Sequence, residues 1–212
     1  MKSIEGIYVI IDPEFINNED PVEMTKKVLA GGAKVIQLRN KIGSTLDTIK
    51  WGTEISNLCN EYDAISIIND RVDIACISNS DGVHLGQKDI HPDLVKQITH
   101  KNLQIGTSNA IISEVEESEK NSSTYIAIGS IFPTTTKSDT RPASLQLLVD
   151  AKKVCKKPIV AIGGINQQNI ESTIETGVDS VCIATAITLS KDPEKTTKSL
   201  SCLLYTSPSP RD

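Results

Sequence analysis

The feature that most constrains the fold of this chain is a regular alternation of short β-branched runs with longer helix-like stretches. Most of the short runs are continuous in Val and Ile rather than alternating between apolar and polar residues, which is typical of parallel strands buried on both faces. The predicted strands are Ile7–Asp12, Val35–Arg39, Ile65–Asp70, Gly82–Leu85, Gln104–Ser108, Tyr125–Ser130, Pro158–Gly164 and Ser180–Thr185.

Helices are predicted in the stretches between these strands. They cover Pro21–Ala30, Ser44–Cys59, Pro92–Ile98, Ser113–Lys120, Ser144–Cys155, Gln167–Thr176 and Ala186–Leu200, with a short further helix after Arg71. Strands and helices that alternate in this way through 212 residues predict an α/β fold, a single-domain (β/α)8 TIM barrel. The alternative is an open, doubly wound sheet. A G-x-G-x-x-G motif is absent from the first strand–helix turn, which counts against a dinucleotide-binding version of that sheet.

Composition argues against several classes of function. The formal net charge is -5 and aromatic residues make up 3% of the chain, so neither the basic surface nor the stacking platform of a nucleic-acid binder is expected. The five cysteines include no C-x-x-C pair, so a zinc site or a disulfide framework is not expected. No segment approaches the ~20 apolar residues that cross a bilayer. Isolated thiols suit a reducing compartment, and we expect a cytoplasmic protein.

The last eleven letters, residues 202–212, read CLLYTSPSPRD and are treated separately. One choice of codons for them resembles a common sequencing-library adapter translated in frame. We therefore interpret this segment as a non-native tail, which leaves a barrel domain of residues 1–201 whose last helix is cut short near Leu200. The alternative is a natural disordered tail rich in Pro and Ser. The segment carries no chemistry on either interpretation.

In a barrel of this type the active site is expected at the carboxyl ends of the strands. The second strand runs into Gln37, Arg39 and Lys41, and alternation along an extended backbone turns these three side chains the same way. A guanidinium can grip a phosphate with two N–H groups, and an ammonium can add a point charge. The alternative is an ordinary solvated loop.

Two aspartates end neighbouring strands and form a candidate metal site. Asp70 closes the third strand, where an unpaired carboxylate would be costly, and Asn69 beside it is a good hydrogen-bonding residue. Asp89 follows the fourth strand, so the two carboxylates could share one Mg²⁺ and leave its other positions to water and phosphate oxygens. The alternative for both is a helix or turn cap. His84 lies inside the fourth strand, and we expect it to be structural.

The remaining strand ends are rich in hydroxyl residues and glycine. The segment 107–109 reads Thr-Ser-Asn and could contact a ligand or, alternatively, cap the next helix. The loop 132–137 offers three threonines and a lysine to an oxyanion, with an unremarkable threonine-rich loop as the alternative. The seventh and eighth strands end in Gly163-Gly164 and Ala184-Thr185, where barrels commonly bind phosphate through backbone N–H groups.

These motifs, in this order, resemble those of the thiamine-phosphate synthase family. The matching segments are QLRNK (37–41), INDRVDIA (68–75), GVHLGQKD (82–89), IGTS (105–108), IFPTTTK (131–137) and VAIGGIN (160–166), within about residues 8–200. The resemblance implies a TIM-barrel transferase of thiamine biosynthesis. It would condense 4-amino-2-methyl-5-(diphosphooxymethyl)pyrimidine with 4-methyl-5-(2-phosphooxyethyl)thiazole to give thiamine phosphate and diphosphate.

Carried over residue by residue, the resemblance implies a role for each matching position. Asp70 and Asp89 would bind Mg²⁺. The catalytic cations that stabilise the departing diphosphate would be Arg39, Lys41 and Lys137. The residues that bind the pyrimidine diphosphate would be Gln37, Arg39, Lys41, Asn69, Ser108 and Lys137. Those that bind the thiazole phosphate would be Thr134, Thr136, Gly164, Ala184 and Thr185.

Two positions depart from the family pattern. Asn40 stands where the family usually has an acidic residue, and we expect its side chain to point away from the trio on the second strand and to have little effect. Ala110 stands where the family often has a histidine, two residues after Ser108. The related thiazole tautomerase relies on a histidine in that loop, so a tautomerase is disfavoured. A non-catalytic thiamine-phosphate binder is a further alternative. The implied partners are small-molecule substrates, and a homo-oligomer is left open.

Overall fold

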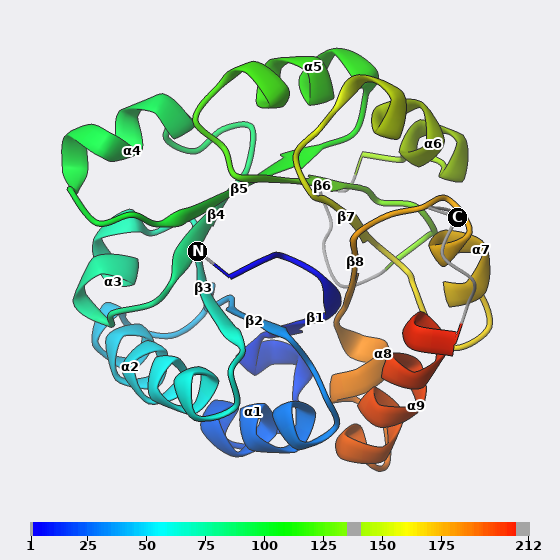
Figure 1. The fold of residues 1–212 in the computed structure, drawn as a ribbon. Coiled ribbons are helices and arrows are strands. Elements are labelled where there is room, and N and C mark those ends of the chain that lie inside the picture. The colour runs from blue at the N-terminus through cyan, green and yellow to red at the C-terminus, as the bar shows by residue number, and fades with distance from the viewer. Residues whose placement is uncertain (1, 135–140, 207–212) are drawn as a thin grey trace.

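Eight parallel strands form a closed barrel in the computed structural model, which describes residues 2–134 and 141–206. Each strand pairs with the next along the chain, and the eighth pairs with the first, so the sheet has no free edge (Figure 1). The strands are β1 (Gly6–Ile11), β2 (Val35–Leu38), β3 (Ile65–Asn69), β4 (Gly82–Leu85), β5 (Gln104–Asn109), β6 (Tyr125–Ile128), β7 (Ile159–Ile162) and β8 (Ser180–Ile183). The predicted barrel is confirmed, and the open-sheet alternative is wrong.

Helices surround the barrel (Figure 1). They are η1 (Pro13–Phe15), α1 (Pro21–Ala30), α2 (Thr45–Glu61), α3 (Val72–Ile77), α4 (Pro92–Ile98), α5 (Ile112–Lys120), α6 (Leu145–Val154), α7 (Ile170–Ile174), α8 (Thr185–Thr188) and α9 (Pro193–Thr206). Their starts follow local signals in the sequence. Asp20 caps α1 by accepting from the N–H of Val22 at 2.8 Å, and Pro21 occupies the first turn.

The C-terminal helices differ from the prediction of one helix over Ala186–Leu200. The structure has two, α8 and α9, because Pro193 cannot continue a helix and instead begins a new one. The side chain of Asp192 caps this second helix by accepting from the N–H of Lys195 at 2.9 Å. The helix α9 continues past residue 202, and Leu203 packs against the core. The non-native origin of the tail stays a prediction.

Two apolar layers hold the barrel together. The larger layer lies between the strands and the helices, and α1 contributes Met24 and Val28 to it. The smaller layer fills the barrel interior with side chains of the strands, among them Tyr8, Tyr125 and Val160. Strand residues alternate between the two layers, which explains why the strands read as continuous apolar runs.

Two further features of the fold concern its thiols and its helices. Cys59, Cys76, Cys155 and Cys182 are free thiols, and burial raises the pKa of Cys59 to about 12. In the described part of the chain, no helix combines the length and the apolar character needed to cross a membrane.

Candidate active site

Charged side chains gather where β1 to β4 end, and we call five of them the charged rim: Asp12, Arg39, Lys41, Asp70 and Asp89. The parallel pairing of β1 with β2 sets Ile11 opposite Leu38, so Asp12 and Arg39 follow as the next facing pair. Nη1 of Arg39 donates to Oδ2 of Asp12. The Asp12 side chain is 2% exposed and that of Arg39 is 18% exposed. A carboxylate buried this deeply requires a partner, and Arg39 supplies it.

A second ion pair joins the ends of β2 and β3. Nζ of Lys41 lies 2.5 Å from Oδ2 of Asp70. The backbone of Asp70 has a φ of 62°, in the left-handed region that aspartate tolerates better than most residues. Its N–H donates to the carbonyl oxygen of His84 at 2.8 Å. This bond to β4 keeps Asp70 at the rim, beside the next strand end.

Asp89 stands next to Asp70. The pKa of Asp89 is raised, first by partial burial and then by the neighbouring carboxylate of Asp70. Oδ2 of Asp89 also accepts from the N–H of Gly86 at 2.6 Å and so closes the turn after β4. The residues before α3 and α4 are Arg71 and His91, so neither aspartate caps a helix. The helix-cap alternatives are wrong, whereas the turn alternative holds for Asp89.

The paired carboxylates fit a divalent cation by their chemistry. Mg²⁺ prefers oxygen ligands and is commonly held by one or two carboxylates, with water in its other positions. In the segments that the structure describes, no group of three or more His, Cys, Asp or Glu side chains is arranged so that it could hold a metal ion. A cation here would therefore rest on Asp70 and Asp89, and it would relieve the repulsion that contributes to the raised pKa of Asp89. Asn69, the last residue of β3, is half-buried beside them.

The loop that carries Lys41 is tied down by Asn40. Its Oδ1 accepts from the N–H of Gly43 at 2.7 Å, and its Nδ2 donates to Oγ1 of Thr48 at 2.9 Å. Oγ1 of Thr48 already donates to the carbonyl oxygen of Ser44, so it has no hydrogen left for a carboxylate. An amide at position 40 therefore suits this loop better than an acid does. Asn40 thus ties its own loop to the first turns of α2, next to Lys41 in the sequence.

Below the rim, an unbroken series of hydrogen bonds crosses the barrel interior, and we call its members the neutral chain: Gln37, Tyr8, Tyr125, His84 and Ser108. Nε2 of Gln37 donates to the hydroxyl of Tyr8 at 2.6 Å, and the hydroxyls of Tyr8 and Tyr125 lie 3.1 Å apart. The hydroxyl of Tyr125 is 3.0 Å from Nδ1 of His84, and Nε2 of His84 is 2.9 Å from Oγ of Ser108. The ends of the chain are two residues predicted to bind the pyrimidine.

The donors of the neutral chain can all run in one direction. Because Gln37 donates to Tyr8, the hydrogen of Tyr8 is available to Tyr125, and that of Tyr125 to Nδ1 of His84. The Nε2–H of His84 then donates to Ser108, whose own hydrogen is left for a ligand. Burial raises the pKa of both tyrosines, so their hydroxyls stay protonated. His84 is thus bonded within the protein, in keeping with the expected structural role.

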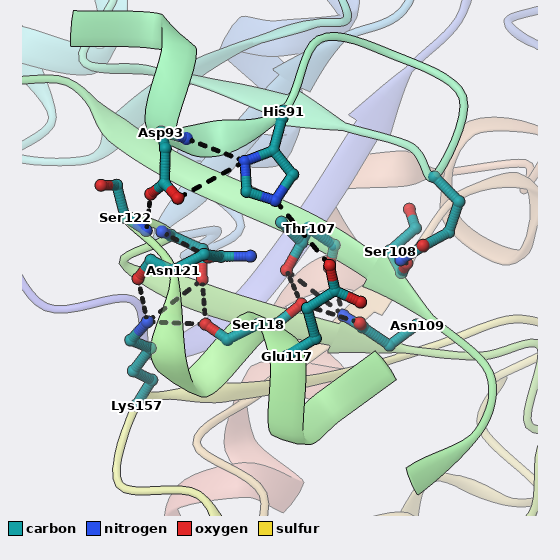
Figure 2. A network of polar contacts seen from close by, with 12 residues as sticks. His91, Asp93, Thr107, Ser108, Asn109, Glu117, Ser118, Asn121, Ser122 and Lys157 are labelled. Carbon is teal, nitrogen blue, oxygen red and sulfur yellow. Dashed lines mark hydrogen bonds and ion pairs between the residues drawn. The ribbon is translucent and has the colours of Figure 1, made fainter. Parts of the chain in front are cut away.

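Polar side chains on the outer face of β5 hold this strand against α5 (Figure 2). Oγ1 of Thr107 donates to Oγ of Ser118 at 3.0 Å, and Ser118 in turn donates to Oδ1 of Asn109 at 2.9 Å. Nζ of Lys157 donates to the carbonyl oxygens of Ser118 and Asn121, and burial lowers the pKa of this lysine. The network therefore fixes the strand from behind.

The orientation of Ser108 follows from this network. Thr107 and Asn109 face α5, so Ser108 between them points into the barrel interior. Nε2 of Gln87 also donates to the Ser108 carbonyl oxygen at 2.8 Å, which ties β5 to the turn after β4. The helix α5 begins after Ile111 without a side-chain cap, so the helix-cap alternative for residues 107–109 is wrong.

The loops after β6, β7 and β8 form the other part of the barrel mouth. Thr134 lies in the first of them, whereas the predicted ligands Thr136 and Lys137 lie outside the described residues. Gly164 has a φ of 63°, and a Cβ there would lie 2.5 Å from the carbonyl oxygen of Pro133. Glycine alone therefore allows the loop after β7 to pack against the loop that carries Thr134. Ala184 and Thr185 begin α8 beyond β8.

Sequence reasoning missed three residues that the structure brings to the site: Asp12, Tyr8 and Tyr125. Asp12 ends β1 as Asp70 ends β3, so the cost of an unpaired carboxylate at the end of a buried strand applied equally to it. The tyrosines carried a weaker signal, a hydroxyl inside an apolar strand that must find a partner once buried.

Comparison with known proteins shows the family to which the chain belongs. A model of the thiamine monophosphate synthase family matches residues 7–187, which is most of the chain. The chain belongs to this family. The thiamine-phosphate synthase of Methanococcus maripaludis is 42% identical over 180 residues, which are 85% of each chain. That of Clostridium acetobutylicum is 37% identical over 188 residues, 88% of this chain and 89% of the relative.

The family is also found among solved structures. Thiamine phosphate pyrophosphorylase from Pyrococcus furiosus superimposes with a TM-score of 0.87 at 36% identity, over 94% of this chain and 95% of that one. Membership of the thiamine monophosphate synthase family makes the chain an enzyme of thiamine phosphate synthesis, and the resemblance seen in the sequence is confirmed. The tautomerase and the non-catalytic binder are not favoured.

Proposed function

We propose that the chain condenses 4-amino-2-methyl-5-(diphosphooxymethyl)pyrimidine with 4-methyl-5-(2-phosphooxyethyl)thiazole, and that Mg²⁺ at Asp70 and Asp89 assists the departure of diphosphate. The observation that carries this proposal is the pair of adjacent carboxylates beside Lys41, on the rim that also holds Arg39. Negative charge grows on a leaving diphosphate, and the two cations of the rim, together with a magnesium ion held by the carboxylates, would match that need.

The chemistry begins as the bond between the pyrimidine methylene carbon and the diphosphate oxygen breaks. The electron pair leaves with the diphosphate, so negative charge grows on its oxygens and positive charge on the methylene. Arg39 and Lys41 stabilise the first from the rim, and Lys137 is the third cation proposed to do so. Bound Mg²⁺ supplies further neutralisation of the leaving group. The thiazole nitrogen then bonds to the methylene carbon, so no protein nucleophile is required.

The two substrates occupy different parts of the barrel mouth. The pyrimidine diphosphate binds to Gln37 and Ser108 with Asn69 beside it. The neutral chain supports this assignment because it holds both Gln37 and Ser108 from within the protein. The thiazole phosphate binds where the last three strands end, and its proposed ligands are Thr134, Thr136, Gly164, Ala184 and Thr185. The close packing of Gly164 on the loop after β6 supports a single site there.

The test of this proposal is a two-substrate assay on the purified full chain. We expect one diphosphate released for each thiamine phosphate formed, and no release when either substrate is omitted or when a chelator removes Mg²⁺. Isomerisation of the thiazole without the pyrimidine would instead indicate a tautomerase. Tight binding of thiamine phosphate without turnover would indicate a binding protein.

We also infer a cytoplasmic location, which the free thiols of Cys59, Cys76, Cys155 and Cys182 support. Whether the chain acts as a monomer or as a homo-oligomer stays open, and light scattering on the purified protein decides it. A disulfide formed in the protein as isolated from cells would speak against the proposed compartment.

A further inference from the structure

We propose that Asp12 is a positioning residue that holds the guanidinium of Arg39 ready for the diphosphate, an inference that rests on the proposed function for the role of Arg39. Both oxygens of the Asp12 carboxylate are in use. Oδ1 accepts from the N–H of Glu14 at 3.1 Å, and Oδ2 accepts from Nη1 of Arg39. Because its side chain is 2% exposed, the carboxylate has little water to replace the arginine, and the pair is a fixed part of the site.

The backbone holds both members of this pair. The N–H of Arg39 donates to the carbonyl oxygen of Ile11 at 2.9 Å, which continues the pairing of β1 with β2. The carbonyl oxygen of Asp12 accepts from the N–H of Phe15 at 2.8 Å, and the Phe15 carbonyl oxygen accepts from Oγ1 of Thr188 at 2.6 Å. The turn η1 is therefore tied to α8, and the carboxylate cannot follow a moving arginine. The arginine instead stays where Asp12 is.

The contact leaves donors for a ligand. Among the bonds of the described residues, the Arg39 side chain donates to Asp12 through Nη1, and a guanidinium has five N–H groups in all. A long side chain normally loses rotamer freedom when it binds a ligand, and Asp12 imposes that loss before the ligand arrives. The remaining N–H groups can then meet a phosphate in a fixed fork.

The charge of Asp12 acts in the opposite direction, since a carboxylate repels a diphosphate. We expect positioning to outweigh repulsion because the two groups differ in accessibility. Arg39 is 18% exposed and Asp12 is 2% exposed, so the guanidinium is the group that a ligand reaches first. A loss of diphosphate affinity when Asp12 is replaced therefore indicates a positioning residue. A gain in affinity would indicate a residue that only neutralises the arginine.

The variant Asp12→Ser separates positioning from capping. Serine is a good N-cap that can still accept from the N–H of Glu14, but it is too short to take over the role of partner to Arg39. The matched control is Asp20→Ser, because Asp20 also caps a helix, accepting from two backbone N–H groups at the start of α1, and is exposed. A change shared by both variants comes from capping, and a change seen in Asp12→Ser alone comes from the arginine.

Steady-state kinetics and calorimetric titration with inorganic diphosphate plus Mg²⁺ provide the readouts. In Asp12→Ser we expect the KM for the pyrimidine diphosphate and the Kd for inorganic diphosphate to rise about tenfold, or about 1.4 kcal/mol. The KM for the thiazole phosphate stays unchanged, and Asp20→Ser changes none of the three constants. Should Asp12→Ser not fold, Asp12→Asn keeps the volume and the cap acceptor and carries the same expectations.

Diphosphate binding as tight as in the wild type, or tighter, would overturn the proposal, as would a rise confined to the thiazole phosphate KM. The titration needs no turnover. If the wild-type chain fails to condense the two substrates but Asp12→Ser still weakens inorganic diphosphate binding, the proposed function is wrong while the positioning role of Asp12 stands.

Discussion

The charged rim and the neutral chain lie next to each other in the barrel and are held together by opposite means. The ion pairs of the rim join neighbouring strand ends, and Lys41 and Asp70 are partly exposed. The neutral chain is buried and links strands that do not pair, since Tyr8 of β1 meets Tyr125 of β6.

Exposed ion pairs contribute little to stability and can exchange partners for a ligand. Buried hydrogen bonds cannot be left unmade without a cost of about 1–3 kcal/mol. The exposed pair of the rim, Lys41 with Asp70, is thus suited to binding, whereas the buried pair of Arg39 with Asp12 and the neutral chain fix geometry.

The largest effect is expected when the rim loses one carboxylate. Asp70→Asn should lower kcat on the order of 10²–10³, the range seen when one stabilising group of a transition state is removed. Thermal unfolding should shift little, because the ion pair with Lys41 is partly exposed. The measurement is kcat at saturating Mg²⁺ together with a melting curve.

The control for this variant is Asp73→Asn. Asp73 lies three residues after Asp70 and forms an exposed ion pair with Arg71, so loss of its charge should leave kcat unchanged. Wild-type turnover in Asp70→Asn would break the comparison, because the rim would then not be the binding part of the site.

An intermediate effect, on stability rather than on rate, is expected when the neutral chain loses its middle hydroxyl. Tyr125→Phe keeps the ring but leaves Tyr8 and His84 without their shared partner. We expect the free energy of unfolding to fall by about 1–3 kcal/mol, or roughly 2–10 °C in Tm. Activity should fall less than in Asp70→Asn.

The control is Tyr62→Phe, which removes an exposed hydroxyl and should change neither the stability nor the activity. An unchanged Tm in Tyr125→Phe would contradict the role given to the chain.

The smallest effect is a gain in stability at the rim. The pKa of Asp89 is raised in the folded state, so the folded chain holds that proton more tightly than the unfolded chain does. The free energy of unfolding therefore falls as pH rises from the unfolded pKa through the raised one, and the penalty is fully present above both. Asp89→Asn removes the charge and keeps an acceptor for Gly86. Without divalent ions we expect the variant to be slightly more stable than wild type at neutral pH.

Urea unfolding at two pH values measures this difference. The difference in free energy of unfolding between Asp89→Asn and the wild type should shrink toward about pH 4, where the wild-type carboxylate becomes protonated. Added Mg²⁺ should stabilise the wild type more than Asp89→Asn and so reverse their order. A variant that is less stable than wild type in metal-free buffer at neutral pH would contradict the repulsion between the two aspartates.

Most of the fold could be predicted because its signals are local. The bounds of α1 and α4 match the prediction, since Pro21 and Pro92 each stand in the first turn after a capping residue. The prediction of a single helix after β8 was wrong, because it did not use the same kind of signal, Asp192 before Pro193. The strands were found within one or two residues because the barrel buries both of their faces.

The site was predictable only where neighbouring strands build it. Asp70 and Asp89 end consecutive strands, so strand order alone indicates that they lie side by side. The middle of the neutral chain could not be predicted, because the bonds of Tyr125 to Tyr8 and to His84 cross the barrel between strands that do not pair. Which buried side chains meet inside a barrel depends on the tilt of the strands and on the diameter of the barrel. The sequence pattern reports only that these side chains face inward.

The neutral chain links what Ser108 can offer a ligand to the side chain at the far end of the barrel. With Gln37 as the donor, the hydroxyls and the imidazole can pass their hydrogens toward Ser108, which keeps its own hydrogen for a ligand. An acceptor in place of Gln37 would let every hydroxyl and the imidazole reverse, because each of them can either donate or accept. Ser108 would then donate to His84 and offer only its lone pairs, so one substitution about a barrel's width away could change which ligand group is preferred.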